Sequence, residues 1–300
     1  MKILVTGGTG LVGGWSALDL ARHGHEVALF ARRPPLPTSP LARFPFVQGS
    51  YFGDDIDAGL FAGFDALVFA ACSDIRHAPA GVGLPGFYQR ANIDGVPKFI
   101  EKARTGGIRR TVYIGTLYAS LRPALGHNDP YVASRIAVDR AIRAMASQDF
   151  HVLTIDIPYA LGGVQGLHSS VFTPIAEWAL GRRPEVPLVA PGGGSNFMSL
   201  RSIAQAVRAA VETMGENGCA YLIGDQNLSF RELCQMFFRA AGREAELPVH
   251  DGEHPLLPDA MLPAGRGGWL RFEADAAAYF GYGRDDVENA VEDIVRVVSI

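Results

Sequence analysis

The first residues able to do chemistry are three glycines in the segment Thr6-Gly7-Gly8-Thr9-Gly10-Leu11-Val12-Gly13. They follow the apolar run of residues 2–6, which is typical of a buried strand, and they open a helical pattern. Glycine allows a sharp turn and the close approach of a pyrophosphate, and the start of the helix offers free N–H groups to that anion. Glycines alone are weak evidence, but this strand-loop-helix context predicts a dinucleotide site.

The choice of dinucleotide depends on the residues after the second strand, residues 27–31. Arg32 and Arg33 stand there, and no acidic residue is near. An Asp or Glu at this place usually binds the ribose hydroxyls of NAD, whereas guanidinium groups suit the 2′-phosphate of NADP. The alternative is that both arginines are ordinary surface residues of a loop. We expect NADP(H) as the cofactor, with NAD as the alternative.

Three further residues form a candidate reaction centre. Thr116 ends the apolar run that begins at Thr111, and a hydroxyl at the carboxyl edge of a parallel sheet lies where such sheets bind ligands. Tyr131 and Arg135 lie four residues apart on the next predicted helix, so they share one helix face and can converge on the same ligand.

The elements that must position these residues are clear in the first half of the chain. Apolar runs of strand length alternate with helical patterns at about 87–105 and 131–147, and this alternation predicts a doubly wound (Rossmann) parallel α/β sheet. The runs are residues 2–6, 27–31, 66–70, 111–115 and 152–156. Beyond Pro158 the pattern changes, which predicts a smaller C-terminal substrate lobe. We expect residues 1–165 and about 196–225 in the dinucleotide-binding domain, and about 166–195 and 226–300 in the lobe.

The composition excludes several classes of function. The 300 residues carry a formal charge of −4, and 48% are hydrophobic, so the chain should fold but has no basic area for nucleic acid. No apolar run approaches the ~18 residues of a membrane span, and a strand beginning at residue 2 leaves no room for a signal peptide. Three cysteines without CxxC spacing predict no metal site. We expect a cytoplasmic protein with a small-molecule substrate.

With these motifs in place, the chain resembles an extended short-chain dehydrogenase/reductase of the NAD(P)-dependent epimerase/dehydratase family. The match covers nearly the whole chain and includes the glycine loop, Asp65–Ala71, Asn92–Gly95 and Pro158. The resemblance implies that Thr116 polarises the substrate oxygen and that Tyr131 gives or takes a proton. The implied cofactor-binding residues are Gly7, Thr9, Gly10, Leu11, Val12, Gly13, Arg32, Arg33, Ser50, Ala70, Ala71, Arg135 and Pro158.

The chain departs from the family at Arg135, where the family has a Lys that holds the nicotinamide ribose. Arg is as cationic as Lys and can favour the ionised tyrosine, but it cannot release a proton in a relay. Arg135 is therefore either an electrostatic substitute or a sign of changed chemistry. Ser50 also replaces the Asp that the family usually places beside the adenine, and the segment from Thr116 to Tyr131 is short. These departures disfavour a nucleotide-sugar diphosphate as substrate.

The motifs and the resemblance leave three functions open. We expect an NADP(H)-dependent oxidoreductase that reduces a carbonyl, or oxidises a secondary alcohol, of a small metabolite. A redox-neutral epimerase or dehydratase with tightly bound NAD(P), and a non-catalytic dinucleotide-binding protein, are the alternatives. The resemblance also implies a homodimer formed by the helices near 88–105 and 131–147, with Ile136, Ala137 and Ala141 as an apolar seam.

Overall fold

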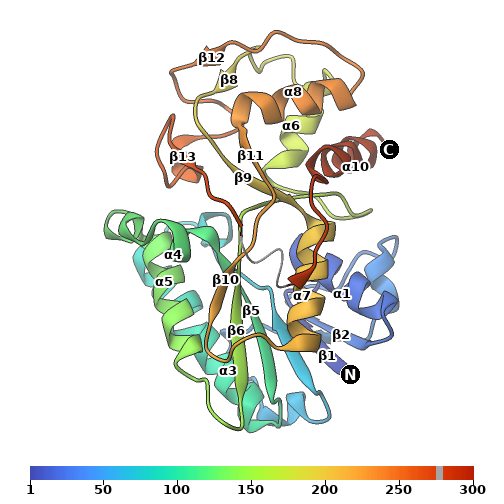
Figure 1. The fold of residues 1–300 in the computed structure, drawn as a ribbon, viewed down its shortest axis with the longest axis vertical. Coiled ribbons are helices and arrows are strands. Elements are labelled where there is room, and N and C mark those ends of the chain that lie inside the picture. Colours follow the sequence, from blue (N-terminus) through green and yellow to red (C-terminus); the bar gives the residue numbers. More distant parts are fainter. Residues whose placement is uncertain (275–279) are drawn as a thin grey trace.

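Seven parallel strands form the main sheet of the computed structural model, which describes residues 1–274 and 280–300 (Figure 1). Their order is β10-β6-β5-β4-β1-β2-β3. The strands are β1 (Lys2–Thr6), β2 (Glu26–Ala31), β3 (Phe46–Gln48), β4 (Ala66–Phe69), β5 (Arg110–Thr116), β6 (His151–Ile157) and β10 (Ala220–Leu222). From β1 the chain adds β2 and β3 on one side, and then β4, β5, β6 and β10 on the other. The predicted doubly wound fold is therefore confirmed.

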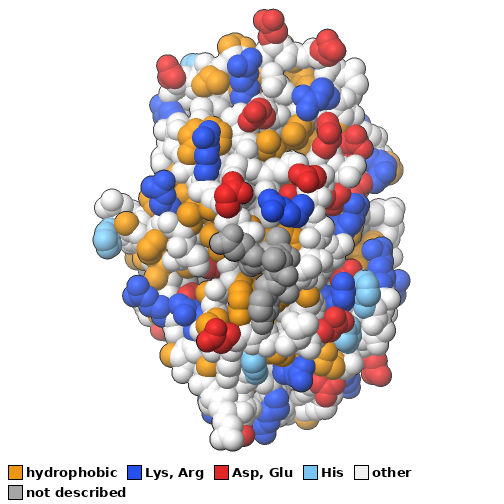
Figure 2. Space-filling model, in the orientation of Figure 1, with side chains coloured by type: hydrophobic (Ala, Val, Ile, Leu, Met, Phe, Trp, Pro, Cys, Tyr) orange, Lys and Arg blue, Asp and Glu red, His pale blue; other side chains and the backbone are white. Residues whose placement is uncertain are grey.

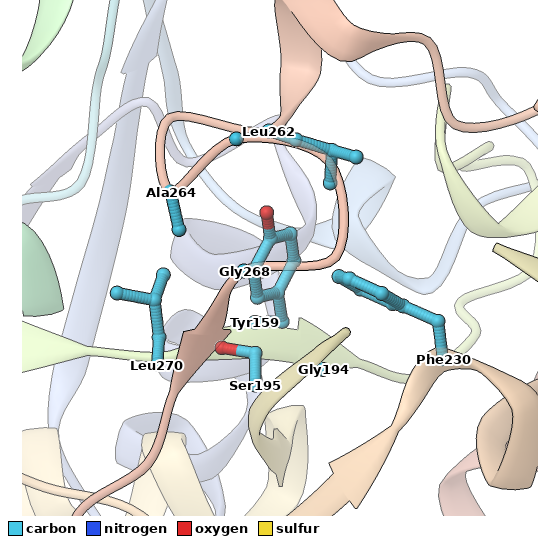
Figure 3. Close-up of a pocket in the computed structure, with 9 residues that line it drawn as sticks. Tyr159, Gly194, Ser195, Phe230, Leu262, Ala264, Gly268 and Leu270 are labelled. Atoms are coloured by element: carbon cyan, nitrogen blue, oxygen red, sulfur yellow. The ribbon is translucent and has the colours of Figure 1, made fainter. Parts of the chain in front are cut away.

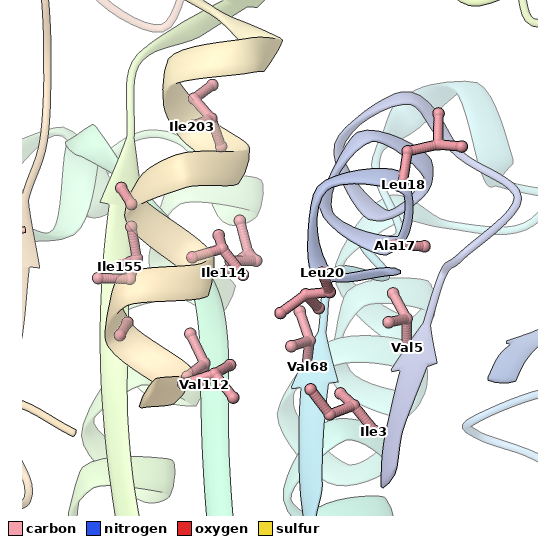
Figure 4. Packing of buried hydrophobic residues seen from close by; sticks show 14 of the residues in the cluster. Ile3, Val5, Ala17, Leu18, Leu20, Val68, Val112, Ile114, Ile155 and Ile203 are labelled. Atoms are coloured by element: carbon pink, nitrogen blue, oxygen red, sulfur yellow. The ribbon is translucent and has the colours of Figure 1, made fainter. Parts of the chain in front are cut away.

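Helices cover both faces of this sheet. On one face α1 (Leu11–Arg22) packs beside α7 (Leu200–Thr213), and on the other lie α3 (Gly95–Thr105) and α5 (Pro130–Arg143) (Figure 1). Figure 4 shows aliphatic side chains of the strands facing those of α1 and α7. The labelled residues are Ile3, Val5, Ala17, Leu18, Leu20, Val68, Val112, Ile114, Ile155 and Ile203. Each large side chain buried in this way contributes about 1.5–3 kcal/mol, so the apolar runs of the sequence become the centre of the sheet.

A second, smaller sheet lies beyond the carboxyl ends of the main strands (Figure 1). Its central strand is β9 (Gly194–Ser199), which pairs with β7 (Tyr159–Leu161), β11 (Gln226–Ser229) and β13 (Trp269–Leu270). Three helices build a separate apolar core against it, namely α6 (Phe172–Ala179), α8 (Phe230–Ala240) and α10 (Val287–Ser299). This C-terminal lobe also contains the short strands β8 (Ala190–Pro191) and β12 (Val249–His250). β7 and most of β9 lie outside residues 166–195 and 226–300, and the predicted division into two domains stays a prediction.

Two short helices depart from the simple alternation, and both lie near the carboxyl edge. The helix predicted over 87–105 is instead α2 (Leu84–Tyr88), a π-helical turn over Gln89–Asp94, and then α3. A five-residue helix, α4 (Leu117–Leu121), directly follows Thr116. No helix within residues 1–274 and 280–300 is long and apolar enough to cross a membrane. Basic and acidic side chains are interspersed over the face seen in Figure 2, as the small net charge would suggest.

Candidate active site

The glycine loop is shaped to receive a large anion. Gly7 has φ +77°, and a Cβ on it would lie 2.7 Å from the backbone nitrogen of Ala71. A Cβ on Gly13 would overlap with the carbonyl oxygen of Gly7, so only glycine fits at either position. No side chain caps the start of α1, where Leu11, Val12 and Gly13 present the first N–H groups of the helix. These groups and the helix dipole fit the pyrophosphate of a dinucleotide.

Residues at the next strand ends would meet the adenosine half of that dinucleotide. Ala31 ends β2 opposite Gln48 of β3, which brings Arg32 and Arg33 to the same edge as Ser50. Both guanidinium groups are exposed, and no ion pair is formed by either within the described part of the chain. The hydroxyl oxygen of Ser50 is buried without a hydrogen-bond partner. The exposed guanidinium groups and the unpaired Ser50 hydroxyl are groups that could contact the adenosine half of a dinucleotide.

Tyr131 is fixed by the start of its helix. Asp129 caps α5, and its carboxylate accepts hydrogen bonds from the N–H groups of Tyr131 at 2.8 Å and Val132 at 3.1 Å. The Tyr131 ring packs near Tyr88, with ring centroids 5.8 Å apart, and its hydroxyl oxygen lies 3.4 Å from Cys72 Sγ. Burial of the ring, followed by the effect of Cys72, raises the pKa of Tyr131 well above its usual value, while Arg135 acts in the opposite direction. Tyr131 is therefore a neutral phenol at physiological pH.

Arg135 lies one helical turn further along α5 and points back to β5. Its Nη2 donates a hydrogen bond of 2.8 Å to the carbonyl oxygen of Ile114, and its guanidinium stands 5.2 Å from the centroid of the Tyr113 ring. The residue is only 3% exposed, and its Nε and Nη1 have no hydrogen-bond partner. Two unpaired donors on a buried cation are costly, so the geometry leaves room for an acceptor such as a ribose hydroxyl.

A buried carboxyl beside Thr116 was not identified as a site residue from the sequence. Asp156 of β6 lies opposite Gly115, and its side chain fills the space where a Cβ of Gly115 would be. Ser120 of α4 donates a hydrogen bond to its Oδ2, whereas its Oδ1 has no partner. Burial is the main cause that raises the pKa of Asp156 to about 7, and the negative charge of Asp139 raises it further. The hydrogen bond from Ser120 and the positive charge of Arg135 act in the opposite direction. The one signal in the sequence is glycine at 115, which leaves space for this side chain.

A small pocket in the C-terminal lobe adjoins the reaction centre (Figure 3). Its lining has no charged side chain and consists of Tyr159, Gly194, Ser195, Phe230, Leu262, Ala264, Gly265, Gly268 and Leu270. Leu270 and Ala264 pack in the same apolar cluster as Tyr131 and Tyr118, which is two residues after Thr116. The Tyr159 hydroxyl donates a hydrogen bond of 3.4 Å to the carbonyl oxygen of Met261. The Ser195 hydroxyl, which Figure 3 shows near Tyr159, is buried and has no partner.

The sequence of this chain is similar to those of known proteins. The sequence model of the NAD dependent epimerase/dehydratase family matches residues 3–224. The chain belongs to this family. A UDP-glucose 4-epimerase of Streptomyces lividans is 28% identical over 87% of this chain and 84% of its own length. A 2-alkyl-3-oxoalkanoate reductase of Stenotrophomonas maltophilia (strain K279a) is 29% identical over 81% of this chain and 76% of its own.

Solved structures of the family share the whole fold. A UDP-glucose-4-epimerase of Stenotrophomonas maltophila with bound NAD and formylated UDP-arabinopyranose superimposes with a TM-score of 0.79 at 20% identity. The match covers 100% of this chain and 98% of the other. These epimerase/dehydratase relatives confirm the predicted extended short-chain dehydrogenase/reductase fold, an NAD(P)-dependent enzyme and dinucleotide binding. Most of the curated relatives that match over most of the chain are UDP-glucose 4-epimerases, so a redox-neutral reaction is at least as well supported as a reduction.

The structure also shows where the other predicted residues of this family site lie. The amide nitrogen of Ala70 hydrogen-bonds to Thr6 O at 2.8 Å, so Ala70 and Ala71 lie beside the glycine loop. Pro158 is buried between β6 and β7, at the same sheet edge as Thr116. Among the residues that the structure describes, no group of three or more His, Cys, Asp or Glu side chains could hold a metal ion.

Asp156 makes the stability of the protein depend on pH. Its pKa in the folded state, about 7, is higher than in an unfolded chain, so the folded state binds the extra proton. The free energy of unfolding should therefore fall as pH rises through the window between about 4 and 7, by up to about 4 kcal/mol from this group. Asp156→Asn should remove this part of the dependence in urea unfolding at about pH 5 and about pH 8. The exposed Asp149→Asn is the control and should behave as the unmodified protein; equal pH dependence in all three would contradict the prediction.

Proposed function

We propose that this epimerase/dehydratase-family protein is an NADP(H)-dependent oxidoreductase that reduces a carbonyl of a small, uncharged metabolite or oxidises the matching secondary alcohol. The observation that carries the proposal is that a neutral, partly buried Tyr131 and the buried cation of Arg135 lie one turn apart on α5. A protonated phenol can donate to a carbonyl oxygen, and the adjacent positive charge stabilises the phenolate that remains.

The side chains divide this work by position. NADPH, when bound, supplies the hydride. Thr116 is at the carboxyl end of β5, where its hydroxyl can hydrogen-bond the substrate oxygen, and Tyr131 gives that oxygen its proton. Arg135 would hold the nicotinamide ribose through Nε and Nη1, the two donors that lack partners. The glycine loop would hold the pyrophosphate, and Arg32, Arg33 and Ser50 the adenosine half.

The residues around the reaction centre support a substrate with little negative charge. A nucleotide diphosphate carries two or more negative charges, and burying them without a cation costs several kcal/mol. None of the nine residues that line the small pocket is basic, and Arg76, which interacts electrostatically with Tyr131, is already paired with Asp74. The pocket itself has room for about one water molecule, so it is not the whole substrate site.

A redox-neutral epimerase is the second candidate, and the Streptomyces lividans relative favours it. The two functions differ in their use of cofactor. A reductase consumes NADPH stoichiometrically with substrate, whereas an epimerase retains its cofactor and turns over UDP-sugars without a change in absorbance. Dinucleotide binding without turnover of either substrate class would point to a binding protein.

Tyr131→Phe tests the proposed proton donor. Because the change removes only the hydroxyl, turnover should fall by the ~10²–10⁴ typical of general acid–base catalysis, with cofactor affinity little changed. Arg135→Lys is the companion variant and should keep or raise turnover if Arg135 acts only through its charge. A raised KM instead would indicate that the guanidinium binds a substrate anion with both nitrogens. The rate of NADPH oxidation measures the turnover of both variants. Undiminished turnover of Tyr131→Phe would contradict the reductase proposal.

Replacement of Arg32 and Arg33 by Ala tests the choice of NADP(H). The double variant should lose roughly 1.5–3 kcal/mol of NADPH binding per charge-assisted contact, before overlap, and NADH binding should hardly change. Arg109→Ala is the matched control, because Arg109 is also exposed but precedes β5 at the opposite edge of the sheet. Calorimetric titration measures both cofactors; equal weakening of the two, or a native preference for NADH, would contradict the assignment.

We also propose that two chains pair through α3 and α5. Ile136, Ala137 and Ala141 of α5 are partly exposed, and Ile136 is also in contact with the segment around Gly126 of its own chain. A second copy would cover this surface and form a four-helix contact. Light scattering should give twice the mass of one chain, and Ala141→Glu should reduce it to the mass of one. A single-chain mass for the unmodified protein would contradict the pairing.

A further inference from the structure

Asp156 is a buried carboxyl that packs against the residue before Thr116. It lies on β6 directly opposite Gly115 of β5, and it is 0% exposed. Its Oδ1 occupies the space beside Gly115, because a Cβ on that glycine would stand 1.9 Å from this oxygen. The carboxyl therefore contacts the backbone of β5 one residue before the hydroxyl that the proposed reaction uses.

Thr116 leads directly into α4. It immediately precedes the first helical residue, its backbone is extended (φ −145°, ψ 143°), and its side chain makes no capping hydrogen bond. A threonine at this place commonly accepts a hydrogen bond from an N–H group of the first helical turn. Because the helix does not use the Thr116 hydroxyl, that hydroxyl is available to another partner. Its direction depends on how the five residues of α4 are held.

Ser120 of α4 is bonded to the same carboxyl. Its hydroxyl donates a hydrogen bond to Oδ2 of Asp156, so one buried side chain contacts the backbone before Thr116 and is bonded to the helix after it. A hydrogen bond to an ionised acceptor is roughly twice as strong as a neutral one. A five-residue helix has little stability of its own. This bond and the burial of Leu117 and Tyr118 therefore decide where α4 lies.

The neighbouring charged groups do not compensate Asp156 in the same way. Asp139 of α5, the other buried acid nearby, accepts hydrogen bonds from Thr154 at 2.8 Å and from Arg143 at 2.9 Å. Asp156 forms no ion pair within the described residues, and its Oδ1 has no hydrogen-bond partner. Burying a carboxyl with so few partners is costly, and an uncharged side chain of similar size would pack at lower cost. Its bond with Ser120, rather than packing, explains a carboxyl at this position.

We infer that Asp156 is a positioning residue that fixes Thr116 for catalysis, through its contact with Gly115 and its hydrogen bond with Ser120. In this role Asp156 does not touch the substrate; it controls the direction of the Thr116 hydroxyl. The effect on catalysis rests on the proposed function, in which that hydroxyl binds the substrate oxygen. The effect of Asp156 on the position of α4 does not rest on it.

The test uses Asp156→Ala and Ser120→Ala, each made in the unmodified protein and in Thr116→Val. Ser120 is exposed, so its replacement opens no cavity and keeps the test valid if Asp156→Ala fails to fold. In the unmodified protein, kcat for the substrate that it turns over should fall about tenfold, and KM for the cofactor should hardly change. In Thr116→Val, which has no hydroxyl to position, either change should lower kcat by less than about twofold. A residue that only stabilises the fold would lower kcat equally in both backgrounds.

Two variants serve as controls. Asp156→Asn keeps an oxygen that can accept from Ser120 and has nearly the same shape, so it should retain kcat to within about threefold. Asp139→Ala removes a neighbouring buried carboxyl that is bonded to Arg143 and Thr154 instead. It should lower the urea concentration at the unfolding midpoint without changing kcat.

Hydrogen exchange gives a second readout that needs neither substrate nor cofactor. Amide exchange in residues 117–122 should become about tenfold faster in Asp156→Ala and Ser120→Ala, but not in Asp156→Asn. An unmodified protein that turns over neither carbonyl compounds nor UDP-sugars would contradict the proposed function, and exchange would still show whether Asp156 holds α4. Unchanged exchange in both alanine variants would overturn the inference. So would an equal fall in kcat with and without the Thr116 hydroxyl.

Discussion

The guanidinium of Arg135 is a positive charge held inside the protein, and burying such a charge costs several kcal/mol unless its surroundings compensate. The carbonyl oxygen of Ile114 and the face of the Tyr113 ring compensate part of this cost, while Nε and Nη1 have no hydrogen-bond partner. The positive charge of Arg135 lowers the pKa of Tyr131, although burial outweighs this effect and keeps the phenol protonated. The same charge lowers the pKa of Asp156, which burial raises.

Parallel strand pairing brings these groups together. Thr6 of β1 lies opposite Phe69 of β4, and Thr116 of β5 lies opposite Ile157 of β6, so loops far apart in sequence emerge at one edge. The C-terminal lobe covers that edge with apolar and hydroxyl side chains rather than with cations. The fold is shared with nucleotide-sugar epimerases, so the reaction and the substrate depend on the side chains at this edge rather than on the fold.

Much of this could be predicted from local pattern. Apolar runs located β1, β2, β4, β5 and β6 to within about one residue, because fully buried strands must be continuously apolar. Gly24, with φ +85°, follows the end of α1, where glycine is favoured because it adopts a positive φ without strain. The glycines of the loop predicted the dinucleotide site, because the backbone geometry of such a site requires residues without a Cβ.

Other features could not be predicted, because they depend on strand register and on contacts between segments that are distant in the sequence. The strands of the small sheet are two to six residues long, and β9 pairs with β7 and β13, whose residues are 38 and 75 positions away, so no local pattern reveals them. Cys72 and Asp156 were visible only as residues of a loop and a strand. Their contacts with Tyr131 and Ser120 arise from how β4 and α5, or β6 and α4, come together in space.

Two adjacent glycines at the small pocket, Gly193 beside it and Gly194 in its lining, are required by the close approach of the main chain. A Cβ on Gly193 would collide with the carbonyl oxygen of Gly268, and one on Gly194 with that of Leu228, because three backbone segments touch there. These positions are closed to mutation by the main chain itself. A change in the shape of the pocket is therefore left to the side chains that line it, which are those of Tyr159, Ser195, Phe230, Leu262, Ala264 and Leu270.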